Sequence, residues 1–128
     1  MTKAEEFARA WRLAYTKSDY SLIEPILHKD YRCFDHRMGM EVDYQTEKAL
    51  IDTVAPLLTV GLWKILYEND DFHVAKVYSR HKDIPPRYNV TMGTVHLVDG
   101  KLFRHELVRE ALDYDPSEGQ DWNWEDYE

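Results

Sequence analysis

The stretch that decides the fold runs from Phe7 to Asp35 and reads FARAWRLAYTKSDYSLIEPILHKDYRCFD. Its first half repeats apolar residues at the i, i+3, i+4 and i+7 spacing of a helix with one buried face. Thr2 and Glu5, just before it, have the spacing of a capping box, which places the helix start there. The apolar positions of this first helix are Ala4, Phe7, Ala8, Trp11, Ala14 and Tyr15.

The second half of the stretch predicts a second, shorter helix and then a strand over residues 31–38. Pro25 shortens or kinks that helix, because proline has no amide hydrogen for the helical ladder. The helix would extend to about Leu27, with Leu22, Ile23 and Ile26 on its apolar face. Residues 44–58 predict a third helix, which Pro56 bends or ends.

After Gly61 the sequence changes from a helical to a strand-like pattern. Four segments rich in Val, Tyr, Leu and Phe are separated by turn signals. The clearest turn is Asp99-Gly100, which suits a type I′ hairpin with two positive φ angles. Three N-terminal helices followed by a strongly curved antiparallel sheet predict an α+β cone. The strand-like segments are residues 62–68, 72–82, 88–98 and 101–112.

Composition and charge limit the classes of function. With 128 residues, residues 1–112 are expected to form a single domain, followed by an acidic aromatic tail at 113–128. That tail holds seven acids and no base, which leaves −1 of the net charge of −8 for the rest. No basic stripe exists, so no nucleic-acid partner is expected. No apolar run approaches the ~18 residues of a membrane span. One cysteine and no signal-peptide pattern predict a reducing, cytoplasmic location.

The layout resembles the nuclear-transport-factor-like superfamily, and within it the SnoaL-like and ketosteroid-isomerase-like proteins. The resemblance covers roughly residues 4–112 and is carried by the opening stretch and by the closing hairpin VDGKLFRHELVRE at 98–110. It implies a cone cavity for a small, largely apolar molecule and a homodimer through the outer sheet face. Because one fold hosts many functions, the resemblance is compatible with isomerases, cyclases, dehydratases, hydrolases and non-catalytic binding modules.

The same resemblance gives two residues a position in a catalytic site. Asp35 falls where a ketosteroid isomerase keeps its general base, and Trp11 falls where it keeps an oxyanion-hole tyrosine. That enzyme also uses a second, protonated aspartate, whereas the matching region around Thr91–Thr94 contains no acid. An indole N–H donates a hydrogen bond but exchanges no proton near neutral pH. Of the three functional residues of a ketosteroid isomerase, this sequence therefore keeps only the general base, at Asp35.

Strand geometry separates Asp35 from its neighbour His36. Successive side chains of a strand point to opposite faces, so these two residues would not form a dyad. Cys33 shares the Asp35 face, which the resemblance turns toward the cavity. Desolvation there would raise the pKa of Asp35 and suit a general base. The alternative is a solvated carboxylate at a strand end, paired with Arg32 or Arg37.

The last strand supplies the second catalytic candidate, His105. The odd positions of this strand are the more apolar set, so they are expected to face the interior. His105, Phe103 and Arg109 would then line the cavity, and a histidine can act as acid or base near neutral pH. The alternative is a core histidine that bonds a backbone carbonyl. On residues 88–98 both faces carry apolar residues, so the direction of His96 stays open.

Further candidates line the predicted cavity or are excluded by spacing. Trp11 and Tyr15 would lie on the cavity wall, and Cys33 is more typical of a small buried residue than of a nucleophile. None of the six histidines has the spacing of a common metal motif, so no metal is expected. No glycine-rich phosphate loop is present, and no cofactor is expected.

Three functions remain open for this sequence. The first is a cofactor-independent acid/base isomerase, cyclase or dehydratase acting on a small molecule in the cavity. The second is a non-catalytic module that binds an apolar ligand. The third is a dimeric interaction domain. Its contact would be the tail, where exposure of Trp122 and Trp124 to water would be costly unless the tail docks.

Overall fold

In the computed structural model, which describes residues 1–128, the first helix α1 spans Lys3–Lys17 and begins where the sequence predicts. The Thr2 hydroxyl accepts a hydrogen bond from the Glu5 amide at 3.2 Å, as in an N-cap. Ser18 ends the helix in the left-handed region, with φ of 52°. The buried face consists of Ala4, Phe7, Ala10, Trp11 and Ala14.

The predicted second helix is wrong, so the chain has two α-helices instead of three. Only a 3₁₀ turn, η1 at Glu24–Ile26, precedes strand β1 at Leu27–Asp35. Leu27 pairs with Leu102 of the last strand, so sheet pairing replaces the helical continuation. The second helix, α2 at Tyr44–Val54, is capped by Asp43 and passes into the 3₁₀ turn η2 at Ala55–Leu57. None of the helices is both long and apolar enough to span a membrane.

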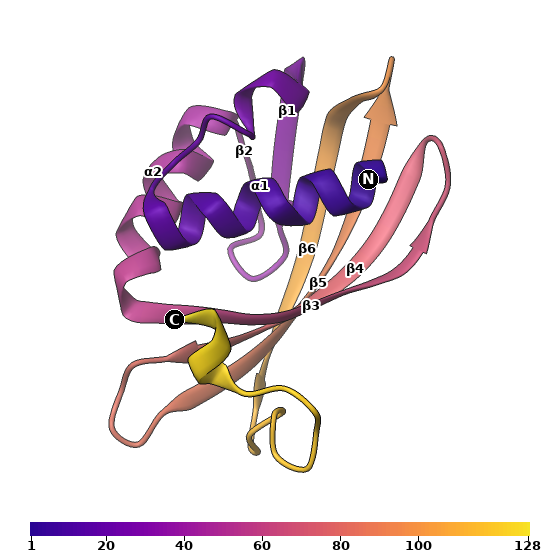
Figure 1. Cartoon of the computed structure of the whole chain (residues 1–128). Coiled ribbons are helices and arrows are strands. Elements are labelled where there is room, and N and C mark those ends of the chain that lie inside the picture. Colours follow the sequence, from indigo (N-terminus) through magenta and orange to yellow (C-terminus); the bar gives the residue numbers. More distant parts are fainter.

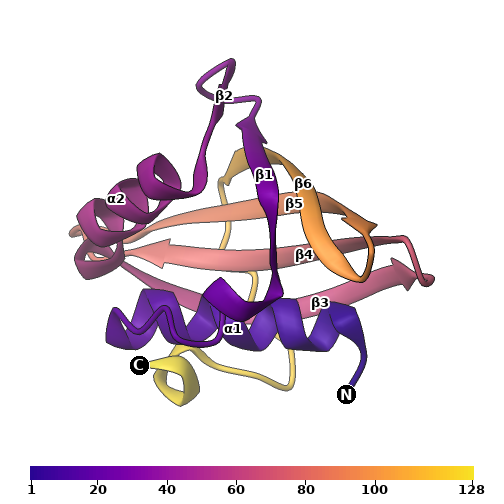
Figure 2. The same ribbon diagram turned by 90° about the horizontal axis from the view of Figure 1, so that it is seen from above.

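The sheet has six strands in the order β2-β1-β6-β5-β4-β3, with β2 and β3 at its edges (Figure 2). From β3 to β6 it is the antiparallel meander that the sequence predicts. However, β1 pairs with β6 in parallel, so the sheet is mixed and the purely antiparallel prediction is wrong. The remaining strands are β2 at Met40–Val42, β3 at Leu58–Glu68, β4 at Phe72–His81, β5 at Arg87–Val98 and β6 at Lys101–Leu112.

The hairpin between β5 and β6 has the predicted turn. Asp99 and Gly100 have φ angles of 53° and 73°, the two positive values of a type I′ turn. Just beyond it, Leu97 pairs with Leu102 and His96 pairs with Arg104, which leaves Phe103 without a partner in a bulge. The alternation of side chains therefore changes at Phe103.

Both helices lie on the concave side of the curved sheet (Figure 1). The register places inward-facing residues in rows that run across the strands. One row joins His73 on β4, Val95 on β5, His105 on β6 and Cys33 on β1. The neighbouring row includes Asp35, which pairs with Leu107 of β6. These rows bring residues from both ends of the chain to one place under α1 and α2.

The acidic tail folds back onto the outer side of the sheet beside β3 (Figure 1). Its end reaches α1, where the Arg12 guanidinium lies over the Tyr127 ring at 4.8 Å. Trp122 and Trp124 are 9% and 2% exposed, and their rings meet edge to face at 4.9 Å. Gly61 of β3 makes this possible, because a Cβ there would lie 2.5 Å from Cζ3 of Trp124. Arg80 of β4 pairs with the Glu128 carboxylate at the end of the tail.

Candidate functional site

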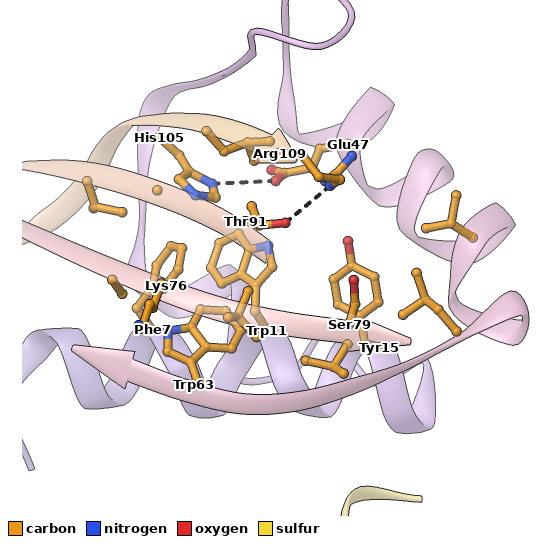
Figure 3. A pocket seen from close by; sticks show the side chains of 18 of the residues that line it. Phe7, Trp11, Tyr15, Glu47, Trp63, Lys76, Ser79, Thr91, His105 and Arg109 are labelled. Atoms are coloured by element: carbon orange, nitrogen blue, oxygen red, sulfur yellow. Dashed lines mark hydrogen bonds and ion pairs between the residues drawn. The ribbon is translucent and has the colours of Figure 1, made fainter. Parts of the chain in front are cut away.

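A cavity of about 190 Å³ lies between the two helices and the concave face of β3 to β6. Hydrophobic residues make up 11 of the 21 that line it. Figure 3 shows a polar group at one side of the cavity, while the polar Lys76 and Ser79 lie beside the aromatic rings. Glu47, Thr91, His105 and Arg109 lie together on one side, and Phe7 and Trp63 lie on the other. A ligand in this cavity would meet an apolar wall and one polar edge.

The aromatic side is organised around Phe7 of α1. Its ring stacks on Trp11 at 4.3 Å between centroids and meets Trp63 of β3 edge to face at 5.9 Å. The same ring also contacts the edges of His73 and His105, at 5.2 and 5.0 Å. Phe7 therefore connects the aromatic wall to the two histidines of the inward-facing row.

His105 lines the cavity and is 8% exposed. Its Nδ1 lies 3.8 Å from Oε2 of Glu47, an ion-pair distance, and 3.5 Å from the Tyr31 hydroxyl. Its Nε2 lies 3.0 Å from where a Cβ on Gly93 would stand, so a larger residue at 93 would press on the ring. Since Gly93 also lines the cavity, Nδ1 faces the buried carboxylate while Nε2 lies on the cavity side.

Glu47 is a polar residue of the site that the sequence prediction missed. It lies on α2, is 8% exposed, and accepts a hydrogen bond from the Tyr31 hydroxyl at 2.8 Å. Burial, followed by the Glu47 charge, raises the pKa of Tyr31, so this hydroxyl stays a donor. A signal for Glu47 existed, because it precedes Ile51 and Val54 by four and seven residues, on the apolar face. An acid at a core position of a helix requires a partner inside the protein.

Cys33 lies beside this group but does not line the cavity. Its Sγ is 3.9 Å from Nδ1 of His105, the residue opposite it in the parallel β1–β6 pair. Burial, with Glu47 adding to it, raises the pKa of the Cys33 thiol well above its ordinary value. A thiol held neutral in this way is a poor nucleophile by itself.

Asp35, the predicted base, is 7% exposed and lies outside the set of residues that line the cavity. Its Oδ2 is 3.5 Å from Nη1 of Arg109, and its Oδ1 accepts a hydrogen bond from the Arg37 amide at 2.9 Å. Arg109 does line the cavity and donates from Nε to the Thr91 hydroxyl at 3.2 Å (Figure 3). The carboxylate therefore holds a guanidinium that reaches the cavity.

The other predicted lining residues divide into two groups. Trp11 and Tyr15 line the cavity, and burial raises the pKa of Tyr15 to about 12, which keeps its hydroxyl protonated. Phe103 does not, because the bulge at this residue leaves Leu102 and His105 pointing inward. The ring of Phe103 meets His28 edge to face at 5.0 Å instead.

Two further histidines, His36 and His96, are exposed and point away from the cavity. His36 is exposed and pairs with Glu106, so it diverges from Asp35 as strand geometry predicts. His96 is exposed on the outer face, where its ring lies 4.8 Å from that of Phe72. Neither residue contributes to the cavity.

His73 has a different environment from any other polar residue in the cavity. It is 2% exposed, and neither ring nitrogen has a hydrogen-bond partner. Burial, with the nearby His105 as a smaller cause, lowers its pKa from 6.5 to about 4. The Nε1 of Trp63, on the neighbouring strand, is also buried without a partner. A ligand with hydrogen-bonding groups would relieve these unsatisfied atoms.

No protein-family model matches the chain, and no curated protein matches it. Several solved structures, however, are similar to it. IdmH from Streptomyces antibioticus, provisionally assigned as a polyketide cyclase, has a TM-score of 0.69 and 12% identity, covering 86% of this chain and 93% of that one. A Catenulispora acidiphila protein with a ketosteroid isomerase-like fold, solved with trimethylamine, has a TM-score of 0.60 and 14% identity, with coverage of 88% and 87%. An LEH-like epoxide hydrolase from M. tuberculosis has a TM-score of 0.59 and 12% identity, with coverage of 84% and 83%.

These similarities define the class of protein by its fold. The chain has the α+β cone fold of the nuclear-transport-factor-like superfamily, as the resemblance in the sequence implied. At 12–14% identity the likeness extends to the fold alone. The chemistry must therefore be argued from the residues of the cavity itself.

Proposed function

We propose that this protein binds a small, largely apolar molecule in the cone cavity and moves a proton on it through His105. The observation that carries the proposal is the orientation of this histidine, with Nε2 on the cavity side and Nδ1 toward the Glu47 carboxylate. A carboxylate in this position orients an imidazole and stabilises its protonated form. His105 would act as the base, and Asp35 would act as a positioning residue for Arg109.

The size of the cavity limits the ligand. An engineered cavity of about 150 Å³ in another protein stays dry and binds benzene, and the cavity here is about 190 Å³. One ring, or two compact fused rings, would fit this space. The polar edge offers Arg109 and the protonated Tyr15 hydroxyl as donors for one oxygen atom. A cyclic ketone combines these properties.

The reaction that this arrangement favours is proton removal next to a carbonyl group. His105 would take the α-proton, and the C–H electron pair would move to the carbonyl oxygen as an enolate. Arg109 and Tyr15 would stabilise that negative charge, and the proton would return from His105 to carbon. No redox partner is needed, because the electron pair stays on the substrate. Isomerisation, cyclisation and dehydration can all begin with this step.

The test uses 2-indanone, a compact ketone of two fused rings with acidic α-hydrogens. In D₂O, we expect the protein to accelerate α-deuterium incorporation, followed by proton NMR. His105→Gln should lower the catalysed rate by about 10²–10⁴-fold, because it removes the proton acceptor. Quenching of tryptophan fluorescence by the ketone should persist in this variant, since Trp11 and Trp63 line the same cavity.

His96→Gln is the matched control, because His96 lies exposed on the outer face of the neighbouring strand. It should exchange deuterium at the wild-type rate. Binding of 2-indanone without exchange above the buffer rate would overturn the acid/base part and leave a non-catalytic binding module. Equal exchange by wild type and His105→Gln would exclude His105 as the base.

We further propose a homodimer through the outer sheet face, in line with the resemblance. Met92 and Val108 are cross-strand neighbours there and are 46% and 55% exposed. An exposed apolar patch of this kind is typical of a contact between copies. The docked tail leaves this part of the sheet uncovered, since its contacts with the sheet are with Gly61, Tyr78, Arg80 and Tyr88.

For the dimer we predict that Val108→Glu shifts the mass measured by light scattering after size-exclusion chromatography from two chains to one. A charge buried in an apolar contact lacks compensation, so association should weaken at least tenfold. Leu57→Glu, which is equally exposed but lies in η2, should leave the mass unchanged. A wild-type protein with the mass of one chain at micromolar concentration would contradict the proposal.

A further inference from the structure

Behind the cavity wall, three potential metal ligands converge from three different elements. They are Sγ of Cys33 on β1, a carboxylate oxygen of Glu47 on α2, and Nδ1 of His105 on β6, all within 4.8 Å of one another. All three residues are buried, at 3%, 8% and 8% exposure. Their spacing along the chain matches no metal motif, so only the fold brings them together. We propose that this cluster is a binding site for Zn²⁺ or a similar thiophilic divalent cation.

The geometry distinguishes such a site from a catalytic triad. In a cysteine–histidine–carboxylate triad, thiol and carboxylate contact different nitrogens of the ring. Here Cys33 and Glu47 approach the same atom, Nδ1 of His105, at 3.9 and 3.8 Å. A thiol and a carboxylate on the same ring nitrogen cannot relay a proton through the ring. Together with that nitrogen, however, they can surround a metal ion.

The separations are close to those of a tetrahedral site. With Zn–S of about 2.3 Å and Zn–N or Zn–O of about 2.0–2.2 Å, neighbouring ligand atoms lie about 3.4–3.6 Å apart. The Cys33–His105 and Glu47–His105 distances of 3.9 and 3.8 Å exceed this by a few tenths of an ångström. The ligand atoms of Cys33 and Glu47 lie within 4.8 Å of each other, so side-chain rotations must draw the three atoms together around an ion. One sulfur, one nitrogen and one carboxylate oxygen suit Zn²⁺, whereas Mg²⁺ and Ca²⁺ require sets of oxygen ligands.

The charges and the outer contacts also fit a divalent cation. A thiolate, a carboxylate and a neutral imidazole carry two negative charges, which one divalent ion neutralises in this buried place. The Tyr31 hydroxyl donates to Oε1 of Glu47, so Oε2 remains free for the ion. Such an outer hydrogen bond orients a metal-binding carboxylate. Glu47 and His105 both line the cavity, which gives an ion its entry path.

Occupancy would change the role of His105. An ion on Nδ1 leaves the ring proton on Nε2, so the side chain can then donate a hydrogen bond but accept no proton. The bound form would hold a ligand without exchanging its α-hydrogen. The metal site stands on its own geometry and does not depend on the proposed reaction.

Cobalt titration of the metal-free full chain tests the site, because Cys33 is the only cysteine. One equivalent of Co²⁺ should produce near-ultraviolet thiolate-to-cobalt absorption, and Zn²⁺ should abolish it by displacement. Cys33→Ser should lose this absorption, and Glu47→Gln should weaken cobalt affinity roughly tenfold or more. Zn²⁺ should raise the Tm of wild type but not that of Cys33→Ser.

His36→Gln is the matched control, since His36 and Glu106 form an exposed pair without sulfur that can also attract cations. This variant should keep the thiolate-to-cobalt absorption at full intensity. Circular dichroism establishes that each variant is folded. If Cys33→Ser is unfolded, the test rests on the thiolate-to-cobalt absorption of wild type and on the cobalt affinity of Glu47→Gln. Absence of thiolate absorption in folded wild type, or unchanged cobalt affinity in Glu47→Gln, would overturn the proposal whether or not 2-indanone is exchanged.

Discussion

Replacement of Trp124 with alanine is expected to lower the free energy of unfolding by about 3–5 kcal/mol. The indole is 2% exposed, covers Gly61 of β3, and donates from Nε1 to the Asp115 carboxylate at 2.9 Å. Arg80 lies over the same ring at 5.3 Å. The substitution therefore removes a packed ring, a hydrogen bond and a cation–π contact together. Guanidinium chloride unfolding followed by far-ultraviolet circular dichroism measures the loss.

Tyr114→Ala is the matched control for Trp124→Ala. Tyr114 is an aromatic residue of the same tail but is 55% exposed, so its loss should change the free energy of unfolding by no more than about 0.5 kcal/mol. If Trp124→Ala costs less than about 1 kcal/mol, the tail is an appendage and not part of the folded unit. A large cost would mean that the domain extends beyond residue 112.

The second large effect concerns pH and comes from His73. Its folded pKa is about 4 and its ordinary value is 6.5, because burial disfavours the charged ring. Between these values the unfolded chain binds a proton that the native protein does not, so stability falls as the pH falls from 6.5 to 4. A tenfold change in proton affinity is worth about 1.4 kcal/mol, so this residue accounts for about 3 kcal/mol of that loss.

His73→Phe should remove this contribution. Urea unfolding at several pH values, in EDTA, should give a loss between pH 6.5 and 4 that is smaller than in wild type by about 3 kcal/mol. At pH 7 the variant should be at least as stable as wild type, because neither His73 nitrogen has a partner to lose. His81, whose pKa is also lowered by burial, contributes equally to both proteins and cancels. If the free energy of unfolding changed with pH by the same amount in both proteins, the assignment to His73 would be refuted.

The sequence predicted those parts of the fold that depend on local chemistry. Thr2 begins its helix with a side-chain cap, and Asp99-Gly100 supplies two positive φ angles, so both features are encoded within a few residues. The prediction of a second helix was wrong because that segment is decided by a contact with a distant part of the chain. Leu22, Ile23, Ile26 and Leu27 have helical spacing, but the partner of Leu27 is Leu102, which lies on the last strand.

The candidate site was harder to predict, because it is assembled from distant segments. His105 was found by the alternation of its strand, and Trp11 and Tyr15 by the helical period. Phe103 was placed inward because a bulge is invisible to simple alternation. The grouping of Glu47 with His105 and Cys33 depends on the approach of α2 to the β1–β6 pair, which no local pattern reports.

The parallel pairing of β1 with β6 also has a consequence for how the protein folds. Cys33 and His105 are direct neighbours in the sheet but are separated by 72 residues of chain. Contacts of such long range are slow to form, because the entropy of closing a long loop opposes them. During synthesis, β1 must wait for the final strand to leave the ribosome. The polar edge of the cavity would therefore be assembled in a late folding step, after the β3–β5 meander and α1 have had time to form.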